Sequence, residues 1–189
     1  MADRRFKELQ PETMTPDQRR VHDAIASGPR GSGLIGPFNA LLRSPDLCDL
    51  AQRFGAHIRV SSSLPARLNE MAIIMVGRKW TAQFEFWAHR KMAIDAGLDP
   101  AICDAIAAGT RPEPMQQDET EIYDFVSELL TTSRVSDASF GRVRDRFGEQ
   151  GVIDLIGALG YYSLVSMVLN VDGVPLPDGE ELPLKPIAA

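Results

Sequence analysis

The sequence predicts an all-α protein, a single-domain bundle of about seven to nine helices. Apolar residues recur at helical spacing along most of the chain, and pairs of Ser, Thr or Asp with proline mark the points where helices would begin. No segment of convincing length alternates apolar and polar residues as a half-buried strand would. A chain of 189 residues can bury an ordinary core without a disulfide or a metal.

Composition divides the chain into three parts. Residues 1–14 form an N-terminal arm, and residues 15–173 carry the helical periodicity. Residues 174–189 contain four prolines, so we expect an extended tail that lies over a surface or over a neighbouring subunit.

The first helix is predicted by its cap. Thr15 precedes a proline and is followed three residues later by Gln18, which is the pattern of a capping box with proline at the first helical position. This helix should continue to about Ser27. The segment 28–37 contains four glycines and two prolines, so a loop is expected there.

The following helices carry the apolar core. A short helical turn is expected over residues 38–42, and Ser44, again followed by proline, should cap the next helix. The segment from Pro65 to Lys79 is apolar nearly all round, so we expect a buried helix. Later helices are expected from Thr81 to Ala96, from Asp99 to Gly109, from Asp118 to Thr132, from Ser136 to Phe147 and from Gln150 to Asn170.

Charge and hydropathy argue against several classes of partner. The chain has 20 Lys and Arg against 26 Asp and Glu and no basic block, so nucleic acid is not an expected partner. The basic N-terminus has no apolar run behind it, which predicts a cytoplasmic protein rather than a secreted one. The uncharged stretch from Leu155 to the residue before Asp172 is short and partly polar, so we expect a buried helix, within a subunit or at an interface, and no membrane partner.

The two cysteines do not form a recognisable motif. Cys48 and Cys103 lie far apart, without CxxC spacing or a histidine at metal-ligand distance in sequence. We expect both to be small buried hydrophobic residues and predict neither a metal site nor a cofactor.

Glu85 and His89 are the first candidates for chemistry. Their spacing of four residues places both side chains on one helix face, where a carboxylate can orient an imidazole and favour its protonated form. The aromatic residues Phe84, Phe86 and Trp87 surround the pair and indicate that part of this helix is buried. A solvated surface pair with the same spacing is the alternative.

Glu70 is a third candidate, because it lies near the start of the apolar helix. A carboxylate buried there could serve as an acid or base, or it could be a first-turn carboxylate that the helix dipole favours. Near the ends of the same helix and the next one, Arg78, Lys79, Arg90 and Lys91 could attract an acidic substrate or could simply be solvated.

Ordered segments of this chain resemble the carboxymuconolactone decarboxylase family. The core of the resemblance is Leu68 to Ile74, Trp80 to His89 and Ala96 to Leu98, and the resemblance extends over residues 15–177. In the related alkylhydroperoxidase D-like branch the pattern is Glu, CxxC and His, which falls here on Glu70, Ala82, Glu85 and His89. Both thiols of the CxxC pair are therefore replaced, and peroxide reduction by that branch needs them.

The resemblance implies an alkylhydroperoxidase D-like helical bundle and a cofactor-free decarboxylase of aromatic catabolism. Its substrate would be a small carboxylated lactone or acid. His89 would be the proton donor or electrophile, Glu85 its orienting partner and Glu70 a second acid or base. Substrate-binding candidates, for which ordinary packing or loop capping is an equal alternative, are Phe38, Asn39 and Tyr161.

Three functions therefore remain open from the sequence. The first is a carboxy-lyase, the second an antioxidant protein with peroxiredoxin-type activity, and the third a non-catalytic oligomer that keeps only the fold. The resemblance and the apolar helices together predict a homo-oligomer, a trimer, hexamer or dimer, with contacts near residues 81–96 and the tail.

Overall fold

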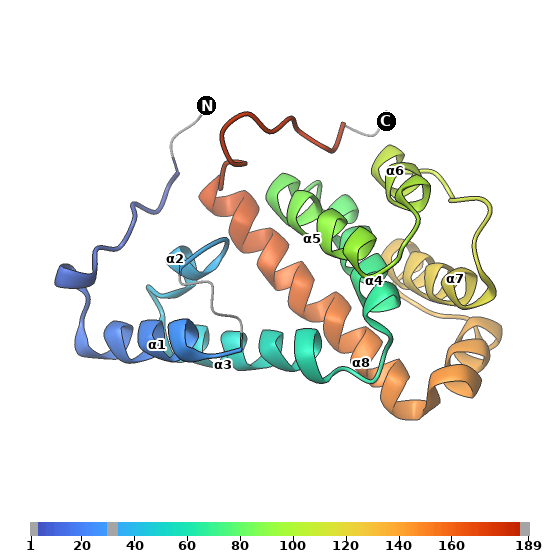
Figure 1. The fold of residues 1–189 in the computed structure, drawn as a ribbon. Helices are drawn as coiled ribbons and strands as arrows, with labels where there is room; N and C mark the ends of the chain where they lie inside the picture. The colour runs from blue at the N-terminus through green and yellow to red at the C-terminus, as the bar shows by residue number, and fades with distance from the viewer. Residues whose placement is uncertain (1–3, 30–33, 186–189) are drawn as a thin grey trace.

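The computed structural model describes residues 4–29 and 34–185, and within these ranges the regular structure is entirely helical (Figure 1). In chain order the elements are η1 (Pro11–Thr13), α1 (Pro16–Ser27), α2 (Phe38–Leu41), α3 (Pro45–Ala56), the π-helical turn η2 (His57–Ser61), α4 (Ala66–Lys79), α5 (Gln83–Asp95), α6 (Pro100–Ala108), α7 (Gln117–Thr132) and α8 (Asp137–Asp172). The predicted all-α, single-domain class is confirmed.

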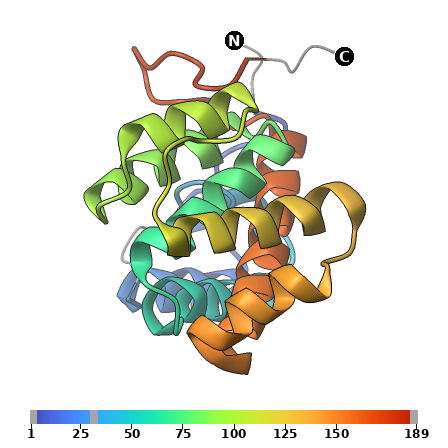
Figure 2. The same cartoon turned by 90° about the vertical axis from the view of Figure 1, so that its right-hand side faces the viewer.

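Helix α4 is the centre of the core. Every residue from Leu68 to Arg78 is buried, and α4 packs against α5, α6, α7 and α8. Figure 2 shows it enclosed between these neighbours. A helix without a polar face can be accommodated only in such a position, which is what its sequence predicts.

Local capping sets the helix ends. Thr15 Oγ1 accepts a hydrogen bond from the Gln18 N–H at 3.3 Å, and Gln18 Oε1 accepts one from the Thr15 N–H at 3.0 Å, so the predicted capping box is present. Helix α5 begins at Gln83, two residues later than expected, because Thr81 adopts a left-handed conformation with φ of 48°.

Helix α8 consists of two helical segments joined at Gly148. This glycine has φ of 72° and ψ of 175°, a conformation that side chains strongly disfavour, and the chain bends there (Figure 1). The break separates the two helices that the sequence predicts over 136–147 and 150–170. By length and composition, α8 is long and apolar enough to cross a membrane, with a mean hydropathy of 1.8 over an 18-residue window. However, 56% of that window is buried inside the protein. This burial is typical of the core helix of a soluble protein.

The described N-terminal arm lies beside the end of α8, and the described part of the tail lies beside the start of α5 (Figure 1). The Arg5 N–H donates to the Asp172 carbonyl at 2.8 Å, and the Phe6 N–H donates to Asp172 Oδ1 at 2.9 Å. In the tail, Leu184 and the side-chain amide of Gln83 exchange hydrogen bonds of 3.0 and 2.8 Å. The described part of the tail therefore covers α5 of its own chain.

Asp172 should be the main anchor of the N-terminal arm. Its buried carboxylate accepts from the Arg4 guanidinium as well as from the Phe6 amide. We expect Asp172→Ala to lower the free energy of unfolding by about 1–3 kcal/mol and to speed hydrogen exchange at the Phe6 amide. Urea denaturation and exchange measured by NMR test this, with the exposed Asp178→Ala as the control. Unchanged exchange at Phe6 would show that the arm is held by other contacts.

Candidate active site

The structure brings Glu70, Glu85 and His89 together at the interface between α4 and α5. His89 Nδ1 lies 2.6 Å from Glu70 Oε2, and His89 Nε2 lies 3.1 Å from Glu85 Oε1. The three residues are only 8%, 3% and 6% exposed, respectively. A solvated surface pair is therefore excluded as the description of Glu85 and His89.

A close approach of the two helices makes this convergence possible. A Cβ atom at Gly77 of α4 would lie 3.3 Å from the Phe86 nitrogen and 3.4 Å from its Cα. A larger residue at position 77 would force the backbones apart. Gly77 thus lets α5 lie close enough to α4 for the side chain of Glu70 to reach His89.

His89 is an imidazolium at neutral pH. Burial lowers the pKa of the imidazole, but the carboxylates of Glu85 and Glu70 outweigh this effect and raise the pKa to about 9. With both ring nitrogens protonated, each faces one carboxylate. The arrangement is a buried ion triad rather than a neutral histidine bridging two acids.

The two carboxylates hold the imidazolium unequally. The contact from Nδ1 to Glu70 is short, as expected for a charge-assisted hydrogen bond. Glu85 Oε1 is farther from Nε2 and does not meet hydrogen-bond geometry. Glu70 therefore makes the shorter of the two contacts with the imidazole, and Glu85, which the sequence predicted as its orienting partner, makes the longer one.

Tyr162 is the aromatic residue that meets the imidazole. Its ring lies edge-on to His89 with the centroids 4.7 Å apart. Tyr161, the residue singled out in the sequence, packs between Tyr162 at 5.0 Å and Phe54 at 5.3 Å and so lies one ring farther from the triad. Two adjacent tyrosines on an uncharged helix give no local signal of which one faces the site.

Asn39 and Phe38 have structural positions in α2. Asn39 Oδ1 accepts from the Leu9 N–H at 2.9 Å, and its amide nitrogen donates to the Phe6 carbonyl at 3.1 Å. Asn39, predicted from the sequence as a substrate-binding residue, thus uses its amide to hold the N-terminal arm. Phe38 is 2% exposed and belongs to the hydrophobic core.

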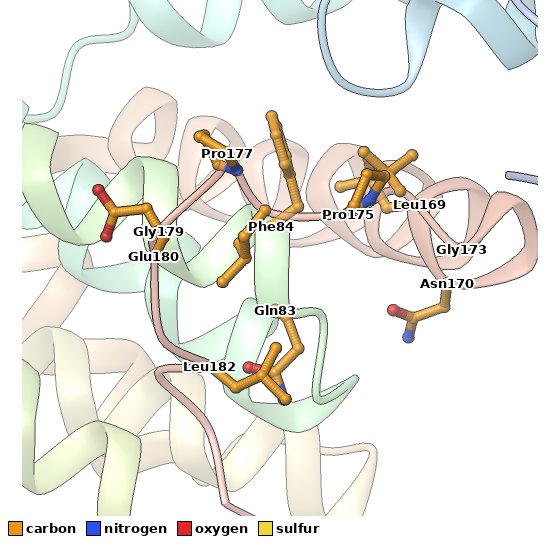
Figure 3. A pocket seen from close by; sticks show the side chains of 12 residues that line it. Gln83, Phe84, Leu169, Asn170, Gly173, Pro175, Pro177, Gly179, Glu180 and Leu182 are labelled. Carbon is orange, nitrogen blue, oxygen red and sulfur yellow. The ribbon is translucent and has the colours of Figure 1, made fainter. Parts of the chain in front are cut away.

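A pocket of about 520 Å³ opens beside the start of α5 (Figure 3). Gln83 and Phe84 line it together with Leu169 and Asn170 from the end of α8, and the tail from Val174 to Leu182 closes the other side. Glu85 follows Phe84 directly in the chain, but its carboxylate faces His89 and is not part of the pocket lining. A molecule bound in this pocket would lie beside α5, the helix that carries Glu85 and His89.

Neither cysteine is suited to thiolate chemistry. Burial raises the pKa of the Cys48 thiol to about 12 and that of Cys103 to about 11. Ala82, at the first position of the CxxC pattern, is fully buried. Among the residues that the structure describes, no group of three or more His, Cys, Asp or Glu side chains is arranged to hold a metal ion.

Comparisons with known proteins identify the fold. No protein-family model matches the sequence, and a search of curated proteins finds no significant match. Among solved structures, an uncharacterized peroxidase-related protein of Ralstonia eutropha, with an alkylhydroperoxidase AhpD core, is similar with a TM-score of 0.74 and 15% identity over 94% of both chains. A peroxidase-related protein of a Silicibacter species has a TM-score of 0.68 and 12% identity over 95% of both chains.

A third similar structure is a protein of unknown function from Agrobacterium tumefaciens, provisionally described as the antioxidant defence protein AhpD. It has a TM-score of 0.65 and 14% identity, covering 75% of this chain and 98% of that one. The chain therefore has the all-helical AhpD-like fold. At these identities the likeness establishes the fold and not the activity.

The ion triad should make stability depend on pH. Because the pKa of His89 is raised from 6.5 to about 9 on folding, its contribution is fully present below pH 6.5 and is lost as the pH rises through 9. The loss should be on the order of 3 kcal/mol. Unfolding free energies measured from pH 6 to 10 should fall in wild type and in the control His22→Asn, but much less in His89→Asn. An equal decline in His89→Asn would contradict the assignment.

Proposed function

We propose that this protein is a cofactor-free enzyme that transfers protons through His89 and acts as a decarboxylase on a small carboxylated lactone or acid. The observation that supports the proposal is the buried imidazolium held between Glu70 and Glu85. Three ionisable side chains buried together are costly, and such clusters concentrate at functional sites.

The proposed reaction requires only proton transfer from the protein. The bond between the substrate carbon and its carboxylate breaks, carbon dioxide leaves, and the electron pair enters the conjugated lactone carbonyl as an enolate. His89 then delivers its Nε2 proton to the carbon while Glu70 holds Nδ1. Solvent then returns a proton to His89. The product therefore carries one hydrogen at the carbon from which the carboxylate left as carbon dioxide.

Thiol-dependent antioxidant activity is the second candidate, because the similar structures from Ralstonia eutropha and Silicibacter are described as peroxidase-related. Attack on a peroxide requires a thiolate, and burial raises the pKa of both thiols well above neutrality. Ala82 and Glu85 stand at the two positions where the CxxC pattern of that chemistry would place its thiols. A non-catalytic protein is the third candidate, and the activity assay below separates it from the first.

Replacement of the triad should abolish turnover. Screening muconolactone-type acids for carbon dioxide release identifies a substrate, and on it His89→Gln should lower kcat about 10²- to 10⁴-fold. Glu70→Gln should also lower kcat by disorienting the imidazole. In wild type kcat should be constant at neutral pH and fall near pH 9 as His89 loses its proton.

The matched control for these variants is the double variant Cys48→Ala with Cys103→Ala, which should keep turnover and lose only packing stability. If it folded normally and lost all activity, a thiol mechanism would replace this proposal. Wild-type protein without turnover on any such acid would favour the non-catalytic candidate.

We also propose a cytoplasmic homo-oligomer. Most of the large exposed apolar side chains lie on α3, η2 and α8, including Leu50 at 61% and Ile153 at 64% exposure. Surfaces of this kind are commonly covered by a second subunit. The proposed contact surface therefore differs from residues 81–96 and the tail, where the sequence predicted the contacts.

Light scattering at micromolar concentration should give a dimer, trimer or hexamer. Leu50→Lys with Ile153→Lys should dissociate it, because charged side chains would be buried at the contact. The solvent-facing pair Glu12→Lys with Asp17→Lys, which also adds positive charge, is the control and should leave the assembly unchanged. A stable wild-type monomer of 20.8 kDa would refute the proposal.

A further inference from the structure

Arg78, in the last turn of α4, is a buried cation that has no carboxylate partner among residues 4–29 and 34–185. The residue is only 5% exposed, in contrast to the solvated side chain that its position near a helix end allows. Within the described ranges its one hydrogen bond runs from Nη1 to the Lys185 carbonyl at 2.8 Å, and its buried Nε has no partner. A guanidinium has five N–H donors, so most of its hydrogen-bonding capacity is unused.

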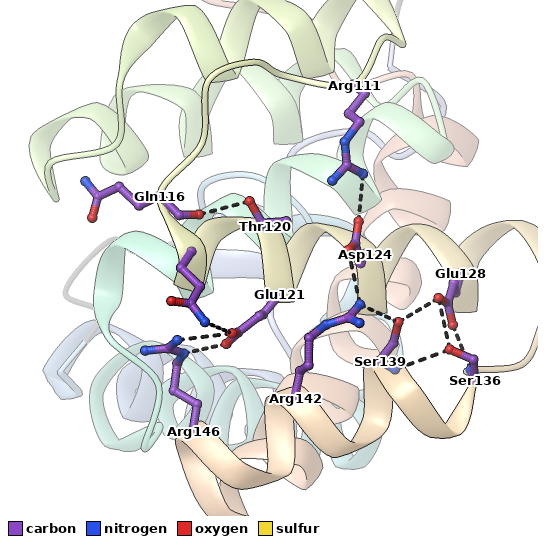
Figure 4. Close-up of polar contacts among 11 residues, drawn as sticks. Arg111, Gln116, Thr120, Glu121, Asp124, Glu128, Ser136, Ser139, Arg142 and Arg146 are labelled. Carbon is purple, nitrogen blue, oxygen red and sulfur yellow. Dashed lines mark hydrogen bonds and ion pairs between the residues drawn. The ribbon is translucent and has the colours of Figure 1, made fainter.

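Three arginines that contact α7 are paired differently (Figure 4). Arg111 and Arg142 both bind Asp124, at 2.6 and 3.1 Å, and Arg146 binds Glu121 at 3.0 Å. Of the acidic side chains of α7 shown there, Glu121 and Asp124 bind these arginines, and Glu128 accepts hydrogen bonds from Ser136 and Ser139. Buried charges are normally paired, so within the described ranges Arg78 is an exception whose charge an anionic ligand would balance.

A small pocket of about 140 Å³ adjoins Arg78, between the end of α4, the end of α6 and the face of α7. The exposed residue Lys79 contributes a second cation at its edge. The hydroxyl residues Ser127 and Thr131 line one side, and Met75, Ile106 and Leu130 give the rest an apolar character.

We propose that this pocket binds the carboxylate of a small organic acid with a short apolar body. The planar fork of Arg78 matches a carboxylate, Lys79 adds charge at the entrance, and the apolar wall accommodates the carbon chain. The volume admits only a few non-hydrogen atoms and is too small for a nucleotide. Inorganic phosphate would fit the charge but would leave the apolar wall without a partner.

This site is separate from the ion triad and does not depend on the proposed function. Arg78 lies eight residues beyond Glu70 on the same helix, which corresponds to about 12 Å along the axis. The pocket of Arg78 contains none of the three triad residues.

Butyrate is the probe for the test, with the neutral butyramide and inorganic phosphate as comparisons. Calorimetry on the full chain should detect butyrate binding in the millimolar range or tighter, at least tenfold tighter than butyramide or phosphate. Arg78→Gln should weaken butyrate binding at least tenfold, and Arg78→Lys should weaken it less. The control Arg134→Gln, which removes one positive charge at an exposed site, should leave the affinity unchanged.

Amide shifts on butyrate addition provide a measurement that needs no variant to fold. In the wild-type protein these shifts should centre on Ser127, Thr131 and the last turn of α4. In a separate experiment, the variant Lys79→Gln should bind butyrate more weakly while keeping the fold. Shifts centred elsewhere, equal affinity for butyramide, or unchanged affinity in a folded Arg78→Gln variant would each overturn the proposal. Tighter binding of phosphate than of butyrate would overturn the assignment to an organic acid.

Discussion

The structure depends on one electrostatic constraint, which is the pairing of a buried imidazolium with two carboxylates. Glu70 and Glu85 could not both be buried and ionised without a cation between them, and His89 could not keep its charge in the core without them. The triad also ties α4 to α5, because the shorter of its two contacts joins Glu70 of α4 to His89 of α5. The tight packing at Gly77 and the apolar surroundings of α4 allow the three groups to meet in the absence of bulk water.

Much of this fold could be predicted because its determinants are local. The capping box at Thr15, the left-handed Gly109 at the end of α6 and the break at Gly148 are each specified by a few neighbouring residues. The pairing of Glu85 with His89 is also local, because four residues make one helical turn. The participation of Glu70 is not local, because its place near the start of the apolar helix fits a first-turn carboxylate equally well, and the resemblance to a known family was needed to connect it with His89.

What the sequence could not predict depends on contacts between distant segments. Asn39 is a short polar residue after a loop, and only the return of residues 6–9 shows which groups its amide binds. Similarly, helical periodicity shows that Tyr161 and Tyr162 share a buried helix but not which of them meets His89. The burial of Arg78 was missed for the same reason, since basic residues at a helix C-terminus are usually solvated and here α6, α7 and the tail cover it.

The replacement of two thiols changes the chemistry that this helical frame can support. Beside a CxxC pair, a histidine four residues further on can take a proton from a thiol and so favour the thiolate. With alanine at position 82 and a carboxylate at position 85, the same histidine has no thiol to deprotonate and acquires a second anion. The two carboxylates raise the pKa of His89 to about 9, so the imidazole holds its proton at neutral pH. The fold is thus shared with peroxidase-related proteins, while the centre of this chain holds a histidine between two carboxylates and no thiol at positions 82 and 85.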